Sequence, residues 1–540
     1  MKEIKNFYTG LFLIAVIVIC SVLLGFDIKN NNTVIADNEG AVFDTNYGSF
    51  LAAQHALYVN DFESANKMIA SVDVDAQIVG QTKILSDFLA GKMPKSAESL
   101  SKDKSLSNRL IYDAYLLNKD DWKSLYKRYN VKDNSAFLAP LKIFSSLKQG
   151  KKKEALKFID SLRVSAASKA FLRGQVAVLE NDIDTAAKEF AKVDVDFMNI
   201  NDYLYLMSFY RENEMFEDMD ILRNDFVSQA GGFYVLYYPD IPEWSVYSGY
   251  KNNLAFSMLQ TVSHTQFLMY TDISLILLRF AQIISDNTNA DAINYYLGNY
   301  LFFNNGKYVP VFEKISDKSP FYLFGQMKIA ESTKDIGAIK KIANKNPLFV
   351  PAVLVSIEDN IKNGNKKAAL RIVNRALNQE DLPDTARVFF LKQRAKIYLA
   401  FDEAKKAQND IDEIFSIDYS LSTDMLLLQS CAWIKQNVNL ESAYEYAMLI
   451  IKKDTSNVIA WDLLGQAVEK KEGVYAALDL MERVGEVAVS VSQLFEHLGD
   501  YYKEIGNNQK AKESYQRAID LSDDGLVVVP NIKKKMKVLK

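Results

Sequence analysis

A residue pattern that recurs 34 positions apart constrains the fold of this chain more than any other feature. Both copies place a large residue, Leu, Gly, a second large residue, Ala, another large residue and a smaller one in the same order. The copies consist of Trp461, Leu464, Gly465, Val468, Ala477, Met481 and Val484, and of Phe495, Leu498, Gly499, Tyr502, Ala511, Tyr515 and Ala518. Apolar residues three or four apart form the buried stripe of a helix, and small residues let a second helix approach closely. A period of this length predicts a solenoid of stacked helix pairs.

The pattern resembles the tetratricopeptide repeat (TPR), a two-helix unit. Turn signals fall where this resemblance requires them, at residues 471–473 and 505–508, where glycine favours the end of a helix. Weaker copies lie upstream, at Leu427, Cys431, Ala443 and Ala447; at Leu391, Ala395, Tyr398, Ala407, Ile411 and Ile414; at Ala369, Val373 and Ala376; at Ala170, Gly174, Ala177, Ala186 and Phe190; and at Ala53, Ala65 and Ile69. With only 10 prolines in 540 residues, the resemblance implies an all-α, TPR-like α-helical solenoid with essentially no sheet.

The resemblance also implies that the first helix of each unit faces a concave groove. The positions expected to point into it are Lys392, Lys396, Lys435, Asp462, Gln466, Glu469, Glu496, Asp500 and Lys503. Charge along this row changes from basic to mostly acidic, which would suit an extended or helical peptide of opposite gradation. One class of these repeats clamps a carboxylate with a Lys and Asn pair. Lys396 stands where that Asn would be, so the clamp is not carried over to this chain.

Residues 7–26 form an apolar run without a charged side chain. At about 1.5 Å per residue such a run spans roughly 30 Å, enough to cross a bilayer. Lys2 and Lys5 precede it and Asp27 follows it, a bias that predicts an inner-membrane, single-pass anchor with the repeats facing the periplasm. Secretion after cleavage near residues 34–36 and a cytoplasm-facing array are the alternatives.

Residues 230–250 depart from the repeat pattern. They combine seven aromatic residues with a Gly-Gly pair and two prolines, so one regular helix cannot run through them. One interpretation is that the aromatic side chains fill the junction between two halves of the solenoid. The other is that Tyr237, Tyr238, Trp244 and Tyr247 line a recognition surface for a protein or an envelope polysaccharide.

A second apolar stretch, residues 267–284, raises the question of another membrane span. Asp272 and Arg279 interrupt it, and both are costly at the centre of a bilayer. The stretch is therefore expected to form a buried core helix.

Other classes of function find no support in the sequence. No phosphate-binding glycine loop, nucleophile elbow, metalloprotease helix or paired-cysteine site is present, so the chain is predicted to be no enzyme and to need no cofactor. The two cysteines and three histidines lie in separate segments, and His55, His264 and His497 are expected at the surface or in packing. Asp410 and Asp412 are expected on solvated faces. A net charge of −4 without a long basic stripe disfavours nucleic acid.

We divide the chain into a membrane anchor (1–26), a tether (27–40), N-terminal TPR-like repeats (41–228), an aromatic-rich insert with apolar helices (229–290), degenerate repeats (291–350), a C-terminal TPR array (351–526) and a basic tail (527–540). The predicted function is a non-catalytic, membrane-anchored scaffold or adaptor that binds other proteins or peptides at the bacterial cell envelope. The alternative is an accessory subunit that binds cell-wall glycan or envelope polysaccharide through residues 233–250.

Overall fold

The computed structural model describes residues 45–74, 76–103, 105–129, 138–228, 232–237, 249–264, 272–285, 290–487, 490–522 and 527–539. These residues form helices and connecting turns, with no strand among them. Contacts divide the chain into two compact units, Met1–Ser86 and Asp87–Lys540. The predicted all-α solenoid of helix pairs is confirmed over the described residues.

The first unit contains the helix pair α2 (Asn46–Tyr58) and α3 (Phe62–Ala70), followed by α4 (Gln77–Leu89), which continues past the unit boundary. Ala53 and Ala65 are fully buried where α2 and α3 pack together, and Ile69 is 1% exposed. Val72 and Val79 complete this small core. The weak repeat copy predicted here is therefore a helix pair.

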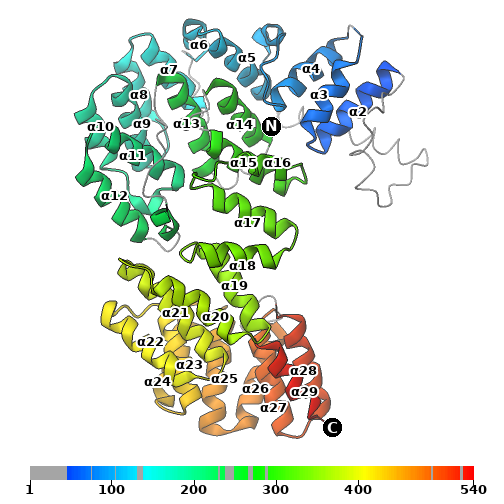
Figure 1. Cartoon of the computed structure of the whole chain (residues 1–540), viewed down its shortest axis with the longest axis vertical. Helices are drawn as coiled ribbons and strands as arrows, with labels where there is room; N and C mark the ends of the chain where they lie inside the picture. Colours follow the sequence, from blue (N-terminus) through cyan, green and yellow to red (C-terminus); the bar gives the residue numbers. More distant parts are fainter. Residues whose placement is uncertain are drawn as a thin grey trace. The chain divides into compact units, whose positions relative to one another are not determined.

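The N-terminal part of the second unit continues the pattern of paired helices (Figure 1). After the 3-10 helix η1 (Ala97–Lys102), the pairs are α5 (Leu106–Asn118) with α6 (Trp122–Tyr129), α7 (Ala139–Lys148) with α8 (Lys152–Ser161), α9 (Ala166–Leu179) with α10 (Ile183–Phe190), and α11 (Ile200–Glu212) with α12 (Phe216–Ser228). Short 3-10 helices η3 (Val195–Phe197) and η4 (Phe233–Tyr237) flank the last pair. Two further helices follow, α13 (Gly249–His264) and α14 (Asp272–Ile284).

Two less regular pairs lead into the C-terminal array, which Figure 1 draws from yellow-green to red. They are α15 (Ala290–Phe303) with α16 (Val309–Phe312) and α17 (Tyr322–Ser332) with α18 (Ile336–Lys345). The array itself consists of α19 (Val350–Lys362) with α20 (Lys366–Leu377), α21 (Asp384–Ala400) with α22 (Ala404–Ile417), α23 (Thr423–Gln436) with α24 (Leu440–Lys453), α25 (Val458–Glu472) with α26 (Val474–Val487), α27 (Ser492–Glu504) with α28 (Asn508–Asp520), and a final helix α29 (Val529–Lys537).

Within a helix pair, glycine on the first helix receives a large side chain from the second helix, 16 residues later. A Cβ added at Gly174 would lie 2.2 Å from the Phe190 ring, and one at Gly499 would lie 2.5 Å from the Tyr515 ring. Gly465 meets the sulfur of Met481 in the same way, at 2.3 Å. The close approach inferred from sequence at the repeat glycines is therefore a direct contact between the first helix and a large side chain of the second.

Nine of the turns inside the pairs share a residue with left-handed backbone, two positions before the second helix. The residues are Asn60, Asp120, Gly150, Asn181, Glu214, Lys334, Gly364, Asp402 and Gly506. Only three of them are glycine, and Asn or Asp tolerates this conformation through local hydrogen bonds. Of these nine turns, the sequence pattern identified only the one at 505–508, because six of the others carry no glycine at that position and Gly150 and Gly364 belong to helix pairs whose repeat pattern is weak or was not predicted.

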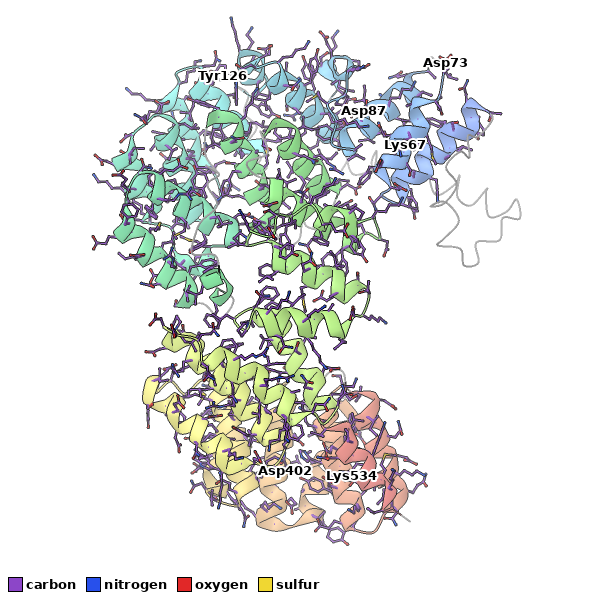
Figure 2. The ribbon with its side chains drawn as sticks, in the orientation of Figure 1. Lys67, Asp73, Asp87, Tyr126, Asp402 and Lys534 are labelled. Atoms are coloured by element: carbon purple, nitrogen blue, oxygen red, sulfur yellow. The ribbon has the colours of Figure 1, made fainter. Side chains whose placement is uncertain are left out.

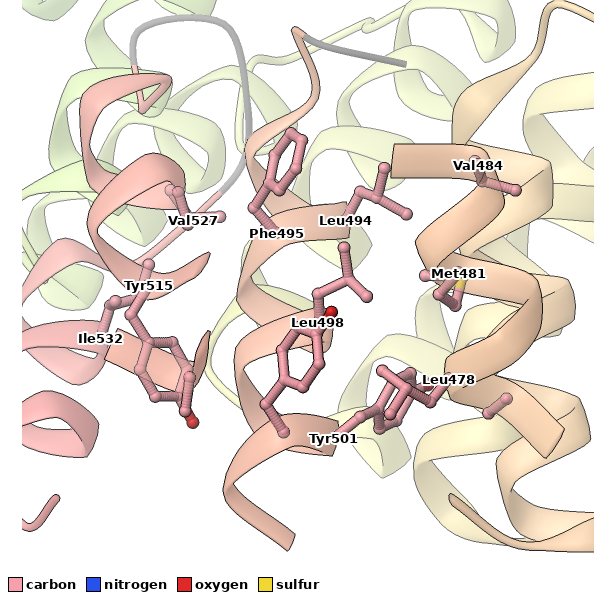
Figure 3. Close-up of a cluster of buried hydrophobic side chains, with 14 residues drawn as sticks. Leu478, Met481, Val484, Leu494, Phe495, Leu498, Tyr501, Tyr515, Val527 and Ile532 are labelled. Atoms are coloured by element: carbon pink, nitrogen blue, oxygen red, sulfur yellow. The ribbon is translucent and has the colours of Figure 1, made fainter. Parts of the chain in front are cut away.

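The last repeats share one hydrophobic cluster, shown in Figure 3. Leu478 and Met481 from α26, Leu498 from α27 and Tyr515 from α28 pack against one another. Ile532, fully buried, adds α29 to the same cluster. Residues 527–540, described from sequence as a basic tail, thus contain a packed helix. Its apolar residues are interspersed with lysines in the sequence, so the basic composition did not indicate a packed face.

The apolar stretch at 267–284 contributes α14, a 13-residue helix whose Leu275, Leu278 and Phe280 are buried in the protein. The expectation of a core helix is confirmed. No helix in the described part of the chain is both long and apolar enough to cross a membrane. The anchor predicted at residues 7–26 and the tether at 27–40 lie outside the described residues.

The one aromatic side chain of the 230–250 segment with a described junction contact is Phe233. It is 1% exposed, and its ring centre lies 5.7 Å from that of Phe389 and 6.1 Å from that of Phe390, both on α21. Phe233 therefore joins the end of the N-terminal helices to the C-terminal array, as the junction interpretation predicted. Tyr238, Trp244 and Tyr247 lie outside the described residues, and so does the side chain of Tyr237.

Asp410 corrects one expectation from the sequence. It was expected on a solvated face, but it is 4% exposed and accepts two hydrogen bonds from the Nε and Nη2 atoms of Arg394, at 3.1 and 2.6 Å to Oδ1. Arg394 also donates to Asn374, at 3.1 Å. Because these residues lie on α20, α21 and α22, the ion pair and the hydrogen bond to Asn374 together connect three successive helices.

Candidate functional site

A cavity of about 410 Å³ lies in the C-terminal array and is the candidate functional site. We call it the groove cavity. Four first helices, α21, α23, α25 and α27, supply most of its wall, and α29 supplies the rest. It is lined by Lys396, Leu399, Ala400, Asp402, Asp424, Leu427, Leu428, Cys431, Lys435, Ile459, Asp462, Leu463, Gln466, Val491, Gln493, Glu496, His497, Asp500, Val528, Asn531 and Lys535.

Six of the nine groove positions predicted from sequence meet at this cavity. They are Lys396, Lys435, Asp462, Gln466, Glu496 and Asp500. The remaining three do not line it: Glu469 forms an ion pair with Lys470 at 2.9 Å, Lys503 is exposed on α27, and Lys392 lies on α21 outside the lining. The repeat spacing thus located one wall of the groove cavity but not its limits.

Most charges in the groove cavity are neutralised within the protein. Lys435 donates to Asp402 at 2.5 Å. The Nζ atom of Lys535 lies 2.8 Å from Glu496 Oε1 and 2.6 Å from Asp500 Oδ2. The gradation from basic to acidic that the sequence suggested is therefore reduced, since α29 brings a lysine to the acidic end.

Buried Asp462 and half-buried His497 form a pair in the wall. The Nδ1 atom of His497 lies 2.8 Å from Asp462 Oδ1, and Gln466 donates to Oδ2 at 2.9 Å. Burial lowers the pKa of His497, but the carboxylates of Asp462, Glu496 and Asp500 outweigh burial and hold this pKa above its ordinary value. The pair is therefore favoured in its charged form.

This pair predicts a pH-dependent stability of the last repeats. A histidine whose pKa is raised on folding stabilises the folded state fully below its unfolded pKa of about 6.5, and this contribution is lost as the pH rises through the folded pKa. We expect hydrogen exchange in α25 and α27 to quicken as the pH rises above about 6.5, after correction for intrinsic exchange rates. A His497→Gln variant should lack this change, and an unaltered pH dependence in that variant would refute the assignment.

Two charged residues of the groove cavity form no ion pair with any described residue. Burial raises the pKa of Glu358 on α19, and the positive charge of Lys396 on α21 opposes this rise without forming an ion pair. Asp424 is exposed at the start of α23. Leu427 and Leu428, three and four residues after Asp424 on α23, line the same cavity. The cavity wall therefore combines apolar side chains with a cation and an anion that form no ion pair among the described residues.

Cys431 also lines the groove cavity. Burial raises the pKa of its thiol to about 11. The thiol is therefore protonated at neutral pH and is a poor nucleophile. Cys431 fills the position where the repeat pattern favours a small residue.

The repeat pattern did not predict four residues that line the groove cavity, Asp402, Asp424, His497 and Lys535. His497 lies 35 positions after Asp462, one repeat plus one residue, and this spacing could have marked the two as neighbours on adjacent first helices. Lys535 could have been found only by noticing that Val528, Ile532, Met536 and Leu539 form a helical apolar stripe within the basic segment.

A second hollow, of about 300 Å³, lies among the N-terminal helices of the second unit. Its wall contains Asp202, whose carboxylate accepts from Gln260 at 2.7 Å and lies 2.6 Å from Nε2 of His264. These partners satisfy Asp202 within the protein. His264, like His497, thus belongs to an Asp–His pair.

No group of three or more His, Cys, Asp or Glu side chains in the described part of the chain is arranged to hold a metal ion. The prediction that Tyr237, Tyr238, Trp244 and Tyr247 form a recognition surface remains a prediction, because their side chains lie outside what the structure describes.

The fold and the groove cavity define the class of this protein as an all-α solenoid of helix-turn-helix repeats. No protein-family model and no curated protein matches its sequence. Similar solved structures do exist. A tetratricopeptide repeat protein from Parabacteroides merdae is 15% identical, with a TM-score of 0.30 over 54% of this chain and 98% of that chain.

Two other similar structures extend over most of the chain. The Cut9 and Hcn1 assembly of the APC/C gives 13% identity and a TM-score of 0.30, covering 91% of this chain and 96% of the matched chain. Yeast Tom70 gives 10% identity and a TM-score of 0.23, covering 92% and 95%. The helix pairs of this chain, with their glycine-to-ring contacts and shared turns, are what establish the repeat architecture.

Proposed function

We propose that this protein is a non-catalytic scaffold that binds a segment of another protein in the groove cavity of its C-terminal array. The observation that carries the proposal is that apolar Leu427 and Leu428 line the same cavity as Lys396 and Asp424, whose charges form no ion pair among the described residues. Protein interfaces combine a desolvated apolar centre with a polar rim that fixes orientation. Four successive first helices build this wall, so an extended or helical segment could contact several repeats at once.

The proposal is tested with peptides selected from a random display library on the purified full chain. Selected peptides are expected to bind a Lys396→Glu variant at least tenfold more weakly, because the variant replaces the free cation with an anion. Lys405→Glu is the matched control, since Lys405 is exposed on α22, the second helix of the same pair, and does not line the groove cavity. Affinity is measured by fluorescence anisotropy.

Equal weakening by both substitutions would indicate a general charge effect. Peptides that bind Lys396→Glu and Asp424→Lys as tightly as the parent protein would contradict binding in the groove cavity.

We further propose that the array is tethered to the inner membrane of a bacterium and faces the periplasm. The apolar run at residues 7–26 and the lysines before it support this placement. The test is protease treatment of spheroplasts that carry a C-terminal tag. Digestion of the tag in intact spheroplasts is expected, whereas protection until lysis would contradict the periplasmic orientation.

A further inference from the structure

Helix α29 forms part of the wall of the groove cavity as well as ending the array. Val528, Asn531 and Lys535 of this segment line the cavity. At its start, α29 reaches the turn between α19 and α20, where a Cβ added at Gly364 would lie 3.2 Å from Cγ of Pro530. The last helix of the array therefore contacts the first helix pair, near which Figure 1 draws it in red.

The acidic end of the groove cavity, formed by Glu496 and Asp500, holds the ammonium group of Lys535. This group is placed between the two carboxylates, at 2.8 and 2.6 Å. It also lies 5.9 Å from the centre of the Tyr515 ring, and the Tyr515 hydroxyl donates to Asp500 at 2.7 Å. Two carboxylates and an aromatic ring together form a subsite for an alkylammonium group.

The charges of the groove cavity favour a basic occupant still more strongly when α29 is absent. Five carboxylates and three lysines line it, an excess of two negative charges, of which a protonated His497 offsets one. One of the three lysines belongs to α29, so the excess would be three without this helix. The carboxylates are Asp402, Asp424, Asp462, Glu496 and Asp500, and the lysines are Lys396, Lys435 and Lys535.

Helix α29 depends on its docking, because a nine-residue helix does not form alone in water. Three buried apolar residues, Val527, Val528 and Ile532, the partly buried Met536 and Leu539, and the contacts of Lys535 secure it. Its other lysines do not line the cavity, and Lys534, labelled in Figure 2, is exposed.

We propose that the acidic end of the groove cavity binds a lysine-bearing, amphipathic helical segment of the partner protein, and that α29 occupies this place until the partner displaces it. The inference rests on the proposed function and names the chemistry of the partner. Lys535 then acts as an internal substitute for the partner's lysine. Because α29 belongs to the same chain, it competes at an effective concentration in the millimolar range.

The probe for this inference is a fluorescein-labelled synthetic peptide with the sequence of residues 527–540. This basic amphipathic segment includes Val528, Asn531 and Lys535, which line the cavity. The peptide is added to the full chain and its binding is followed by anisotropy. The wild-type chain should bind it weakly, because α29 is already docked. Ile532→Asp, which places a charge in the buried contact of α29, should bind it at least tenfold more tightly, and Lys535→Ala should change binding in the same direction.

Two further comparisons identify the subsite. Adding Glu496→Gln and Asp500→Asn to the Ile532→Asp chain should weaken peptide binding at least tenfold. A peptide with Lys535→Glu should fail to bind, whereas one with Lys534→Glu should lose much less affinity, because Lys534 is exposed. Circular dichroism confirms that each variant is folded, and Lys535→Ala provides the test should Ile532→Asp not fold.

The inference is overturned when folded Ile532→Asp and Lys535→Ala chains bind the peptide no better than wild type, or when the two carboxylate substitutions have no effect. A separate result distinguishes it from the proposed function. Library peptides that require Lys396 but leave hydrogen exchange at residues 529–537 unchanged would support binding in the groove cavity and refute displacement of α29.

Discussion

A Gly499→Val variant is expected to destabilise the last helix pair by about 3 kcal/mol or more. A Cβ at this position would already lie 2.5 Å from two atoms of the Tyr515 ring, and valine adds two more carbons. Tyr515 is fully buried, and its hydroxyl is tied to Asp500, so the ring has no free space into which it could move. The helices α27 and α28 must separate to accept the change.

Because each repeat of a solenoid contacts mainly its neighbours, the loss is best measured locally, by hydrogen exchange of the amides of α27 and α28. Gly465→Val provides a graded comparison. Its new side chain would meet the flexible Met481 rather than a ring, so the loss of stability should be smaller than in Gly499→Val. Gly80→Ala is the control: Gly80 lies within α4 with no atom near its added Cβ, and alanine there should stabilise α4 by about 0.5–1 kcal/mol. Equal protection of α27 and α28 in Gly499→Val and wild type would contradict the packing described.

An Asp410→Ala variant is expected to cost about 2–3 kcal/mol, somewhat less than the full range for breaking a buried ion pair. The carboxylate is 4% exposed and accepts from both Nε and Nη2 along one edge of the Arg394 guanidinium, so its removal leaves a half-buried charge without its counterion. The Arg394 side chain is 22% exposed and can partly reach water, which limits the loss. Hydrogen exchange in α21 and α22 reports the change.

Asp410→Asn keeps the shape and one acceptor and should be milder than Asp410→Ala. The double variant Arg394→Met with Asp410→Leu removes both charges and should recover much of the stability, because apolar side chains of similar volume often replace a buried ion pair without loss. A double variant that is as unstable as Asp410→Ala would show that geometry, rather than the unpaired charge, sets the cost.

The repeat units could be predicted from sequence because their packing is local. Gly499 and Tyr515 lie 16 residues apart, within one helix pair, and this contact repeats at Gly465 and Gly174. The same spacing separates Arg394 from Asp410, so the burial of Asp410 was within reach of the sequence pattern, although a carboxylate alone gives no sign of it.

The groove cavity could be predicted only in part. Asp462 and Glu496 were found because they recur at the repeat spacing on first helices. Lys535 could not be found this way, since its place depends on where α29 docks after the last repeat, and no periodicity extends to that contact. The cavity is consequently less acidic than the repeat helices alone would make it, because Lys535 adds a positive charge.

Binding of a partner protein in the groove cavity is tested most directly by site-specific photocrosslinking in the native cells. A photoreactive amino acid replaces Asp424, which lines the cavity, or Glu445, which is exposed on α24, the second helix of the same pair. With a partner bound there, position 424 should give one defined adduct, which a Lys396→Glu background should lose, and position 445 should give none. Adducts from position 445 with none from position 424 would contradict binding in the groove cavity.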